Sequence, residues 1–463
     1  MMTSPDSRKE LEHEVVVVGA GSAGIAAAVA SARNGADTLL VESGATLGGD
    51  LISGLPIDGC RSTGGDWIVG GVAAELFDEC RAFGGYVGSI FDRRNICVVM
   101  VNPRVMGFAV LRLLKKYGVG ILPYTQAIGL AAENGRVAGL ELANKTVRLA
   151  ARAELYLDCT GDADLAVMAG LPFETGEETQ PASMTFQFRG LDSRALLEFV
   201  RDHPENCGLG ENPLVRKTAP ELARELYEEG IPKVFFSGEG PLIKAAVESG
   251  ELFPCSMLAL NPNSPDYTCV TVNTTRMVLP DNTGGGALGE AMLALTDQVV
   301  QAAAFVRKRI PGFAGASFDG VAPRLGIRES RRIVGEYRLG ERDVAEGIKR
   351  GDGVCKGGHE IDVHGRDRDH VRLAIRNAGS YDIPLGCLLP KGMANLLAAG
   401  RSLSSDRVAN SSARVMGTCM GMGQAAGTAA ALCAKGKILP RELDIGLLRG
   451  TLREQGAILD GTP

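Results

Sequence analysis

The chain has 463 residues, a length at which one hydrophobic core rarely suffices, so two or three structural units are expected. Its 49 Lys and Arg residues against 55 Asp and Glu residues give a net charge of −6, without a long basic block, which argues against a nucleic-acid partner. The 61 glycines favour an enzyme-like fold with many tight backbone turns over a fibrous or coiled-coil chain.

The 11 cysteines form no CxxC pair and no Cys/His cluster at zinc spacing, which predicts free thiols, no metal site and a reducing, cytoplasmic location. Two uncharged stretches resemble membrane segments. The first, 15–32, follows Glu10, Glu12 and Glu14 where a signal peptide has basic residues. The second, 416–434, consists mostly of small residues that suit an interior helix, so no membrane span is expected.

A βαβ unit is predicted at the start of the chain, after a frayed polar segment over residues 1–13. The β-branched run Val15–Val18 is typical of a buried parallel strand, and the Ala-rich helix Ile25–Asn34 follows it. Gly35 ends that helix, and Thr38–Val41 is the second strand.

Later segments predict a β-meander and then a change of architecture. Short apolar runs over 121–157 alternate with turn residues, as in an antiparallel meander, and Glu154–Cys159 returns as a strand. Beyond it, expected helices at 220–229 and 288–309 alternate with a strand at 267–272.

The fold class expected is α/β, with a Rossmann-like domain carrying the inserted meander and a mixed α+β cap domain. The predicted division is 11–171 for the first part of the nucleotide-binding domain, 172–380 for the substrate or cap domain, and 381–463 for the returning part. Within the last part a strand is expected at 395–400 and a long small-residue helix up to Lys435, docked on the first domain.

The glycine pattern after the first strand predicts dinucleotide binding. Gly19 permits a tight turn, Gly21 lets backbone amides approach a pyrophosphate, and Gly24 lets helix and strand touch. Glu42, at the end of the second strand, is placed to accept hydrogen bonds from ribose hydroxyls. Strand, spacing and acidic residue agree, although these features alone fit NAD as well as FAD.

Three further segments favour FAD. The loop 46–50 resembles the GG-containing loop of flavoproteins, and 158–162 resembles the strand-end T-G-D element of glutathione-reductase-like flavoproteins. The segments 395–401, 414–417 and 423–430 resemble the C-terminal flavin-binding signature of the FAD-dependent oxidoreductases related to fumarate reductase and succinate dehydrogenase flavoproteins. The stretch 328–337 is similar to one branch of that family.

This resemblance implies noncovalently bound FAD, with its pyrophosphate at the glycine turn and its flavin N1 edge at the start of the helix after Met416. A helix N-terminus stabilises the negative charge of reduced flavin. The glycines at 421–427 are interpreted as helix packing rather than as a second nucleotide loop, because no strand runs into them. The residues predicted to contact the cofactor are Gly19, Ala20, Gly21, Ser22, Ala23, Gly24, Glu42, Ser43, Gly48, Gly49, Asp50, Ala127, Thr160, Gly161, Asp162, Gly400, Arg401, Arg414, Gly423, Gln424 and Ala425.

Candidates for substrate chemistry are chosen by residue type. His364, in a D-x-H element that resembles the family's, is a candidate to exchange a proton while flavin moves a hydride. Arg328 and Arg331 are candidates to bind a substrate anion, and Tyr381 is a weaker proton donor. Each also has a purely structural interpretation, as a hydrogen-bonding or ion-pairing residue.

The leading hypothesis is therefore an FAD-dependent dehydrogenase or reductase of a small organic substrate, acting on a hydroxyl or a C–C bond next to a carbonyl or carboxylate. A flavin monooxygenase and a non-catalytic flavin-binding sensor or subunit are the alternatives. The electron partner is undefined, because no second complete GxGxxG unit marks an NAD(P)H domain. The sequence leaves a homo-oligomer open.

Overall fold

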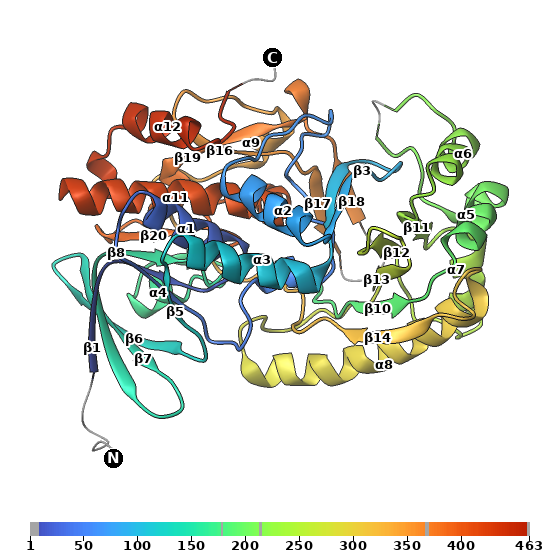
Figure 1. Cartoon of the computed structure of the whole chain (residues 1–463), viewed down its shortest axis with the longest axis horizontal. Helices are drawn as coiled ribbons and strands as arrows, with labels where there is room; N and C mark the ends of the chain where they lie inside the picture. The colour runs from blue at the N-terminus through green and yellow to red at the C-terminus, as the bar shows by residue number, and fades with distance from the viewer. Residues whose placement is uncertain (1–8, 177–178, 213–214, 366–369, 461–463) are drawn as a thin grey trace.

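The computed structural model describes residues 9–176, 179–212, 215–365 and 370–460. They build two hydrophobic cores, one around a seven-stranded sheet and one around a five-stranded sheet. In Figure 1 the first sheet lies on the left, covered by α1 and α11, and the second lies on the right with α5, α6 and α7. The long helix α8 runs along the lower edge of the view.

The first sheet has a parallel centre, as predicted. Strands β1 (Lys9–Val18), β2 (Thr38–Val41) and β5 (Gly120–Leu122) run parallel, and β1 also pairs in parallel with β8 (Arg148–Asp158). The β-branched half of β1 is buried on both faces, which is why Val15–Val18 reads as an unbroken apolar run.

The expected fraying before residue 14 is wrong for residues 9–13. Lys9–His13 belong to β1 and pair with residues 149–153 of β8, because β8 is long enough to offer them a hydrogen-bonding partner. Residues 1–8 of that predicted segment lie outside the described part of the chain.

The predicted meander is confirmed, and it extends the same sheet. Strands β6 (Gln126–Glu133) and β7 (Arg136–Ala143) form a hairpin, and β7 pairs antiparallel with the first half of β8. The second half of β8 pairs in parallel with β20 (Leu396–Ala398). The sheet therefore unites both ends of the chain, with the order β5-β2-β1-β8-β7-β6 and β20 beside β8.

Helices α1 (Ser22–Arg33) and α11 (Met416–Gly436) pack at backbone distance. A Cβ on Gly423 would lie 2.1 Å from the Ala23 carbonyl oxygen, and one on Gly427 would lie 2.0 Å from that of Ala27. The small residues of this predicted helix thus serve helix packing, as expected. In the described part of the chain, none of the helices has the length and apolar character needed to cross a bilayer.

Further elements complete the first core. Its helices α2 and α3 flank the hairpin β3–β4, and α12 packs on α11 near the C-terminus (Figure 1). The bounds of these and the shorter elements are α2 (Val72–Ala82), β3 (Tyr86–Phe91), β4 (Cys97–Val101), α3 (Pro103–Lys116), α4 (Asp164–Met168), β9 (Phe173–Glu174), β15 (Arg332–Ile333), α9 (Glu341–Ala345), β16 (Gly353–Gly357), β17 (Ile361–His364), β18 (His370–Leu373), β19 (Tyr381–Pro384), α10 (Arg407–Ala413) and α12 (Ile445–Glu454).

The second core surrounds an antiparallel sheet in the order β11-β12-β13-β10-β14. Its buried apolar residues run from Ala182 to Leu325, whereas those from Leu339 onward join the first core. Its elements are β10 (Phe186–Arg189), α5 (Ser193–Asp202), α6 (Ala219–Glu229), β11 (Val234–Ser237), α7 (Pro241–Glu248), β12 (Met257–Pro262), β13 (Cys269–Asn273), α8 (Gly285–Arg309) and β14 (Ser317–Val321).

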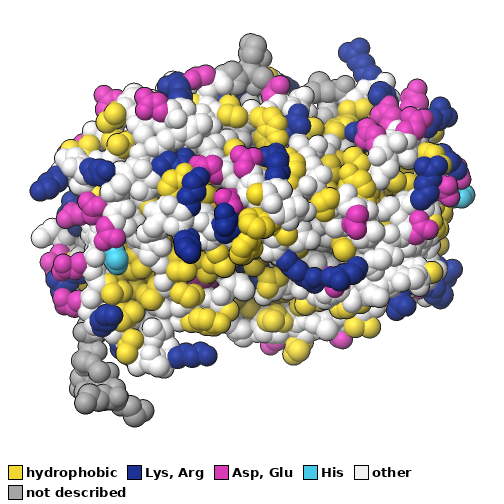
Figure 2. Space-filling view, in the orientation of Figure 1, with side chains coloured by type: hydrophobic (Ala, Val, Ile, Leu, Met, Phe, Trp, Pro, Cys, Tyr) yellow, Lys and Arg dark blue, Asp and Glu magenta, His cyan; other side chains and the backbone are white. Residues whose placement is uncertain are grey.

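On the face drawn in Figure 2, Lys and Arg side chains are interspersed with Asp and Glu and with small hydrophobic patches. This distribution agrees with the nearly balanced composition. The concentration of charge that matters for function lies inside the molecule, between the two sheets.

Candidate functional site

The glycine turn between β1 and α1 has the geometry of a phosphate-binding turn. A Cβ on Gly24 would lie 1.7 Å from the Gly19 carbonyl oxygen, and Gly19 itself has φ +97° and touches the backbone of Cys159. A Cβ on Gly21, in contrast, would meet nothing within 4 Å, because this residue faces an internal cavity. The turn therefore leaves room at the N-terminus of α1, where a pyrophosphate is stabilised by backbone amides and the helix dipole.

Glu42 lies beside this turn at the end of β2. Its Oε2 accepts a hydrogen bond from the Ala20 amide at 2.7 Å, and its Oε1 accepts one from the Gly44 amide at 2.8 Å. The Ser43 hydroxyl is 3.3 Å from the same carboxylate. Ala127, on β6, is buried in the small core behind this corner. The geometry agrees with a ribose-binding carboxylate next to a phosphate-binding turn.

A single cavity extends from the glycine turn to the second sheet. On the first domain, the cavity wall includes Cys159, which was not predicted to contact the cofactor. It also includes eight residues that were predicted to do so, namely Ser22, Gly49, Asp50, Thr160, Gly161, Gly400, Arg401 and Arg414. The loop that carries Gly48 is tied to the turn by a hydrogen bond of 2.9 Å from its amide to the Ala20 carbonyl. One carboxylate oxygen of Asp50 is buried without a hydrogen-bond partner in the described structure.

Arg401 holds the T-G-D element in place. Its Nη2 lies 2.6 Å from Asp162 Oδ1, and its Nε donates to the Gly161 carbonyl at 2.9 Å. Both segments follow neighbouring strands, β8 and β20, so their ends meet at one edge of the sheet. Asp162 therefore anchors Arg401 rather than lining the cavity.

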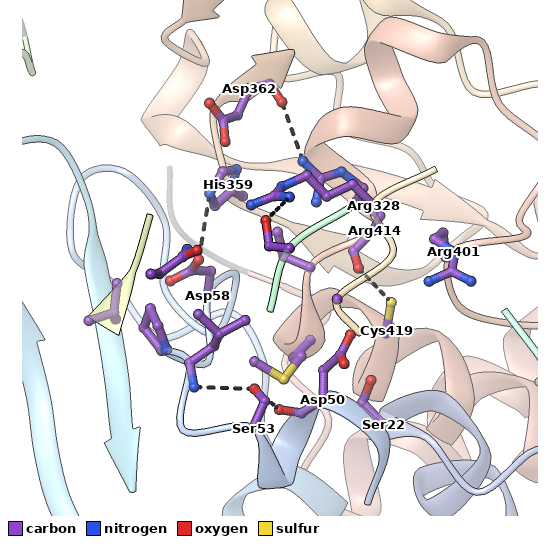
Figure 3. A pocket seen from close by; sticks show the side chains of 18 of the residues that line it. Ser22, Asp50, Ser53, Asp58, Arg328, His359, Asp362, Arg401, Arg414 and Cys419 are labelled. Carbon is purple, nitrogen blue, oxygen red and sulfur yellow. Dashed lines mark hydrogen bonds and ion pairs between the residues drawn. The ribbon is translucent and has the colours of Figure 1, made fainter. Parts of the chain in front are cut away.

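The long helix α11 begins at the cavity wall. Val415, its N-cap, and Met416 both line the cavity, as does Cys419 one turn further on. The Cys419 thiol donates to the Arg414 carbonyl at 3.2 Å, shown by a dashed line in Figure 3. The positive end of the helix dipole is thus directed at the cavity, as the sequence predicts for a flavin N1 site.

Two half-buried arginines lie in the wall next to this helix start. Arg328 donates from Nη1 to the Pro181 carbonyl and to the Ser183 hydroxyl, both at 2.6 Å. Arg414 donates to Gln180 Oε1 at 3.2 Å, and its Nε is buried without a partner in the described structure. Burial, with Arg414 nearby, lowers the pKa of Arg328 to about 10. Figure 3 shows both guanidinium groups on the side of His359 and Asp362, opposite Asp50 and Ser53.

Two histidines line the same wall, each with a carboxylate. His364 Nε2 lies 3.0 Å from Asp362 Oδ2. His359 Nδ1 lies 2.8 Å from the Glu360 carbonyl, and its Nε2 is 3.9 Å from Asp58 Oδ2 (Figure 3). A carbonyl can only accept, so Nδ1 of His359 carries a proton and Nε2 is the atom that faces Asp58.

Gln180 links the two halves of this polar wall. Its side-chain Oε1 accepts from Arg414 and, at 3.2 Å, from the His364 backbone amide, while the backbone amide of Gln180 donates to the fully buried Glu329 at 3.2 Å. Glu329 is in turn paired with Arg332 and Arg407. Gln180 is therefore a positioning residue for Arg414 and for the strand that carries His364.

The structure places two predicted catalytic residues outside the cavity. Arg331 turns toward the Asp162 carbonyl, at 2.7 Å, and toward Asp164. The Tyr381 hydroxyl lies 2.9 Å from the Ser412 hydroxyl in a fully buried position. Both have the structural environments considered as their alternatives, so neither is brought together with His364 and Arg328.

The last three predicted cofactor residues also lie away from the cavity wall. Gly423 packs on α1, and Ala425 is fully buried in the first core. Gln424 Oε1 accepts from the Val72 amide at 3.0 Å, at the start of α2. None of these three residues lines the cavity, although each was predicted to contact the flavin.

Several residues of the wall carry no local sequence signature, among them Asp58, Arg94, Lys233 and His359. Asp58 lies in a loop before α2, and Arg94 lies in the β3–β4 turn. Lys233 belongs to the second domain, and His359 lies just before β17. Strand alternation in β17 would have placed Glu360, Asp362 and His364 on one face. No such signal exists for His359 or for Lys233.

A parallel βαβ unit whose glycine turn faces a cavity with charged residues in its wall is the arrangement of a dinucleotide-dependent enzyme. The chain belongs to the FAD dependent oxidoreductase family, whose model matches residues 14–452. It is an enzyme that uses FAD, and the pyrophosphate space at Gly21 fits that cofactor.

Curated relatives match only part of the chain. A tRNA uridine 5-carboxymethylaminomethyl modification enzyme of Flavobacterium johnsoniae is 32% identical over 145 residues, which are 28% of this chain and 21% of that protein. The Bacillus subtilis enzyme of the same name is 36% identical over 91 residues, which are 20% of this chain and 13% of that protein. The chain thus spans about a fifth or less of these relatives' length.

Solved structures resemble the chain over nearly its whole length at low identity. A geranylgeranyl bacteriochlorophyll reductase-like protein of Thermoplasma acidophilum has a TM-score of 0.48 and 11% identity, covering 97% of this chain and 85% of its own. A p-nitrophenol 4-monooxygenase of Pseudomonas putida has a TM-score of 0.46 and 10% identity, covering 98% and 91%.

Proposed function

We propose that this flavoenzyme is a dehydrogenase or reductase of a small organic acid, acting on a hydroxyl or on a C–C bond next to a carboxylate. The observation that carries the proposal is the pair Arg328 and Arg414. Both line the cavity, and neither forms an ion pair with a carboxylate of a described residue. A partly buried guanidinium that forms no ion pair is costly to keep away from water, so an anionic ligand is the expected partner.

FAD, when bound, supplies the hydride acceptor or donor. Ser22, Gly49, Asp50, Gly161 and Gly400 would hold it along the cavity, with the start of α11 facing the flavin. We propose that FAD is bound noncovalently. Acid precipitation of the protein should then release all flavin absorbance into the supernatant.

The arginines position the substrate by their fork geometry. Arg328 is fixed by the Pro181 carbonyl and the Ser183 hydroxyl, which leaves Nε and Nη2 to bind a carboxylate. Arg414 is fixed through Gln180. The walls around them exclude bulk water, which strengthens each charge interaction with a bound anion.

His359, with Asp58, is the group we propose to exchange the proton. Its Nε2 is the nitrogen that faces Asp58, since Nδ1 is held by the Glu360 carbonyl. Burial raises the pKa of Asp58 to about 6, with His359 opposing the shift, so the pair can hold or release one proton near neutral pH. His364, held by Asp362, is the second candidate for this role.

The small-molecule proposal is favoured over an RNA substrate by burial. Both histidines are buried, and the two arginines, which are half-buried, line the same cavity. The tRNA named for the curated relatives belongs to proteins such as those that match 20% to 29% of this chain. The absence of a nucleic-acid partner stays a prediction, as does the cytoplasmic location.

The experiment that tests the proposal is anaerobic titration of the FAD-loaded enzyme. A panel of hydroxy acids should bleach the flavin absorbance, or enoates should reoxidise the reduced enzyme, and neutral alcohols of the same size should do neither. If no carboxylate in the panel changes the redox state of the flavin, the proposal fails. A transient absorbance band on mixing reduced enzyme with oxygen would instead support the monooxygenase alternative.

A further inference from the structure

The cavity has a second cationic end, formed by the second domain. Lys233, which directly precedes β11, is fully buried and lines the cavity. Its Nζ donates to Asn261 Oδ1 at 2.6 Å and lies 3.8 Å from the centroid of the Phe235 ring. Asn261 is its only hydrogen-bond partner among the described residues, and no described carboxylate forms an ion pair with it.

A lysine in this setting has unused binding capacity. An ammonium group has three donors, and Asn261 takes one of them, while the Asn261 amide is itself fixed by the Thr271 carbonyl at 3.2 Å. Burial lowers the pKa of Lys233 to about 8, which is the cost of holding this charge away from water. Bound anionic oxygen would offset that cost.

Arg94 supplies a second cation at the same place. Its guanidinium carbon lies 4.9 Å from the Phe235 centroid, and the residue lines the cavity from the β3–β4 turn. Its Nε pairs with Glu211 at 2.7 Å, on the side of the second domain. Lys233 and Arg94 therefore flank one aromatic ring, and we call these three residues the Phe235 subsite.

Two carboxylates near the Phe235 subsite have other partners, although one oxygen of Asp58 has no hydrogen-bond partner in the described structure. Asp92 Oδ1 accepts from the amides of Arg94, Asn95 and Ile96 at 2.9, 2.6 and 3.0 Å, so it closes its own turn. Asp58 faces His359. Asp58 lines the same cavity, and its negative charge raises the pKa of both Lys233 and Arg414 against the opposite effect of burial.

We propose that the Phe235 subsite binds a second anionic oxygen group of the substrate, a carboxylate or a phosphate, while Arg328 and Arg414 bind the first. Binding of the first group by Arg328 and Arg414 rests on the proposed function, whereas binding of the second group rests on Lys233 and Arg94 alone. The substrate class is thereby narrowed to small acids with an anionic group at each end, oriented by cations from two different domains.

The test compares singly and doubly charged probes of equal length on the FAD-loaded protein. Monocarboxylates from propionate to hexanoate, dicarboxylates from malonate to adipate, and 3-phosphonopropionate are titrated, with dissociation constants from calorimetry and from the flavin spectrum. At the best length, the second charge should tighten binding about tenfold or more. The dissociation constants of 3-phosphonopropionate and of the dicarboxylates show which anionic group the Phe235 subsite prefers.

Lys233→Met should reduce that gain to less than about twofold and leave the affinity of the monocarboxylates unchanged. Lys244→Met, on the exposed face of α7, is the matched control and should keep the whole gain. Because Met fills the buried space without a charge, the thermal midpoint of Lys233→Met should not fall. A merely structural lysine would lower the midpoint and leave the gain intact.

The subsite is overturned if no probe length shows a gain from the second charge, or if Lys233→Met weakens single and double charges equally. Arg328→Met separates the two proposals. If Arg328→Met leaves monocarboxylate binding unchanged while the Lys233-dependent gain persists, the proposed function fails and the Phe235 subsite stands.

Discussion

Asp58 and His359 face each other in the wall of the cavity, with 3.9 Å between Oδ2 and Nε2. The other oxygen of Asp58 is buried without a hydrogen-bond partner in the described structure, and the other nitrogen of His359 is held by a backbone carbonyl. The pair therefore has one site for a mobile proton and one oxygen directed at whatever enters the cavity. Proton exchange between protein and substrate is the chemistry this arrangement serves.

Replacement of His359 should remove the proton exchange without removing substrate binding. In His359→Asn we expect kcat to fall about 100-fold or more and KM to change less than threefold, because general acid–base catalysis contributes about that much. The limb of the kcat/KM profile that Asp58 sets near pH 6 should move to higher pH, because the charge of His359 lowers the pKa of Asp58. The same substitution at His364 is the matched comparison, and a larger loss there would transfer the role to His364.

Asp58 should make stability depend on pH. Its pKa in the folded protein, about 6, is above the unfolded value of 3.8, so the folded state binds the proton more tightly. The resulting stability is fully present below about pH 4 and is lost as pH rises through 6. Asp58→Asn, which cannot ionise, should therefore gain in thermal midpoint relative to the native protein between pH 4 and pH 8, by a few degrees.

The exposed residue Asp297 provides the control for this measurement. Asp297→Asn should change the thermal midpoint by the same amount at pH 4 and at pH 8. An equal shift for Asp58→Asn would contradict the raised pKa of Asp58.

Two glycines of the same turn should fail in different ways. Gly21→Ala should leave the fold intact, because the added Cβ meets nothing within 4 Å, and it should weaken FAD binding about tenfold or more by filling the pyrophosphate space. Gly24→Ala should destabilise the protein even without cofactor, because its Cβ would lie 1.7 Å from the Gly19 carbonyl oxygen.

The measurement for both glycine variants is flavin content together with thermal unfolding of the cofactor-free protein. A cofactor-free Gly21→Ala protein that unfolds earlier than the native one would show that Gly21 serves the fold rather than the cofactor. Equal flavin content in Gly21→Ala and native protein would remove the pyrophosphate from this position.

The cofactor half of the site was predictable because it depends on short-range patterns. The run Val15–Val18, the glycine spacing and the strand Thr38–Val41 each specify a local structure, and the three are contiguous in the chain. The small residues of α11 were predictable for the same reason, since close helix packing needs glycine at helical spacing.

The substrate half was only partly predictable because it assembles residues that are distant in sequence. Arg328 and His364 were identified by type, but Arg331, only three residues from Arg328, points to the opposite side of its segment. Lys233 becomes significant only when the second sheet folds over the cavity. The environment of a buried charge is a tertiary property, and the residue type alone does not reveal it.

The contrast between Arg328 and Arg331 gives the last prediction. Arg328→Lys should raise KM for an acidic substrate about tenfold or more, because an ammonium group cannot both hold the Pro181 and Ser183 oxygens and present two parallel donors to a carboxylate. Arg331→Lys should change kcat/KM less than about twofold, since its guanidinium is directed at Asp162 and Asp164 outside the cavity. Steady-state kinetics with flavin content as the control for folding measures both, and a KM increase confined to Arg331→Lys would mean that Arg331, and not Arg328, binds the substrate anion.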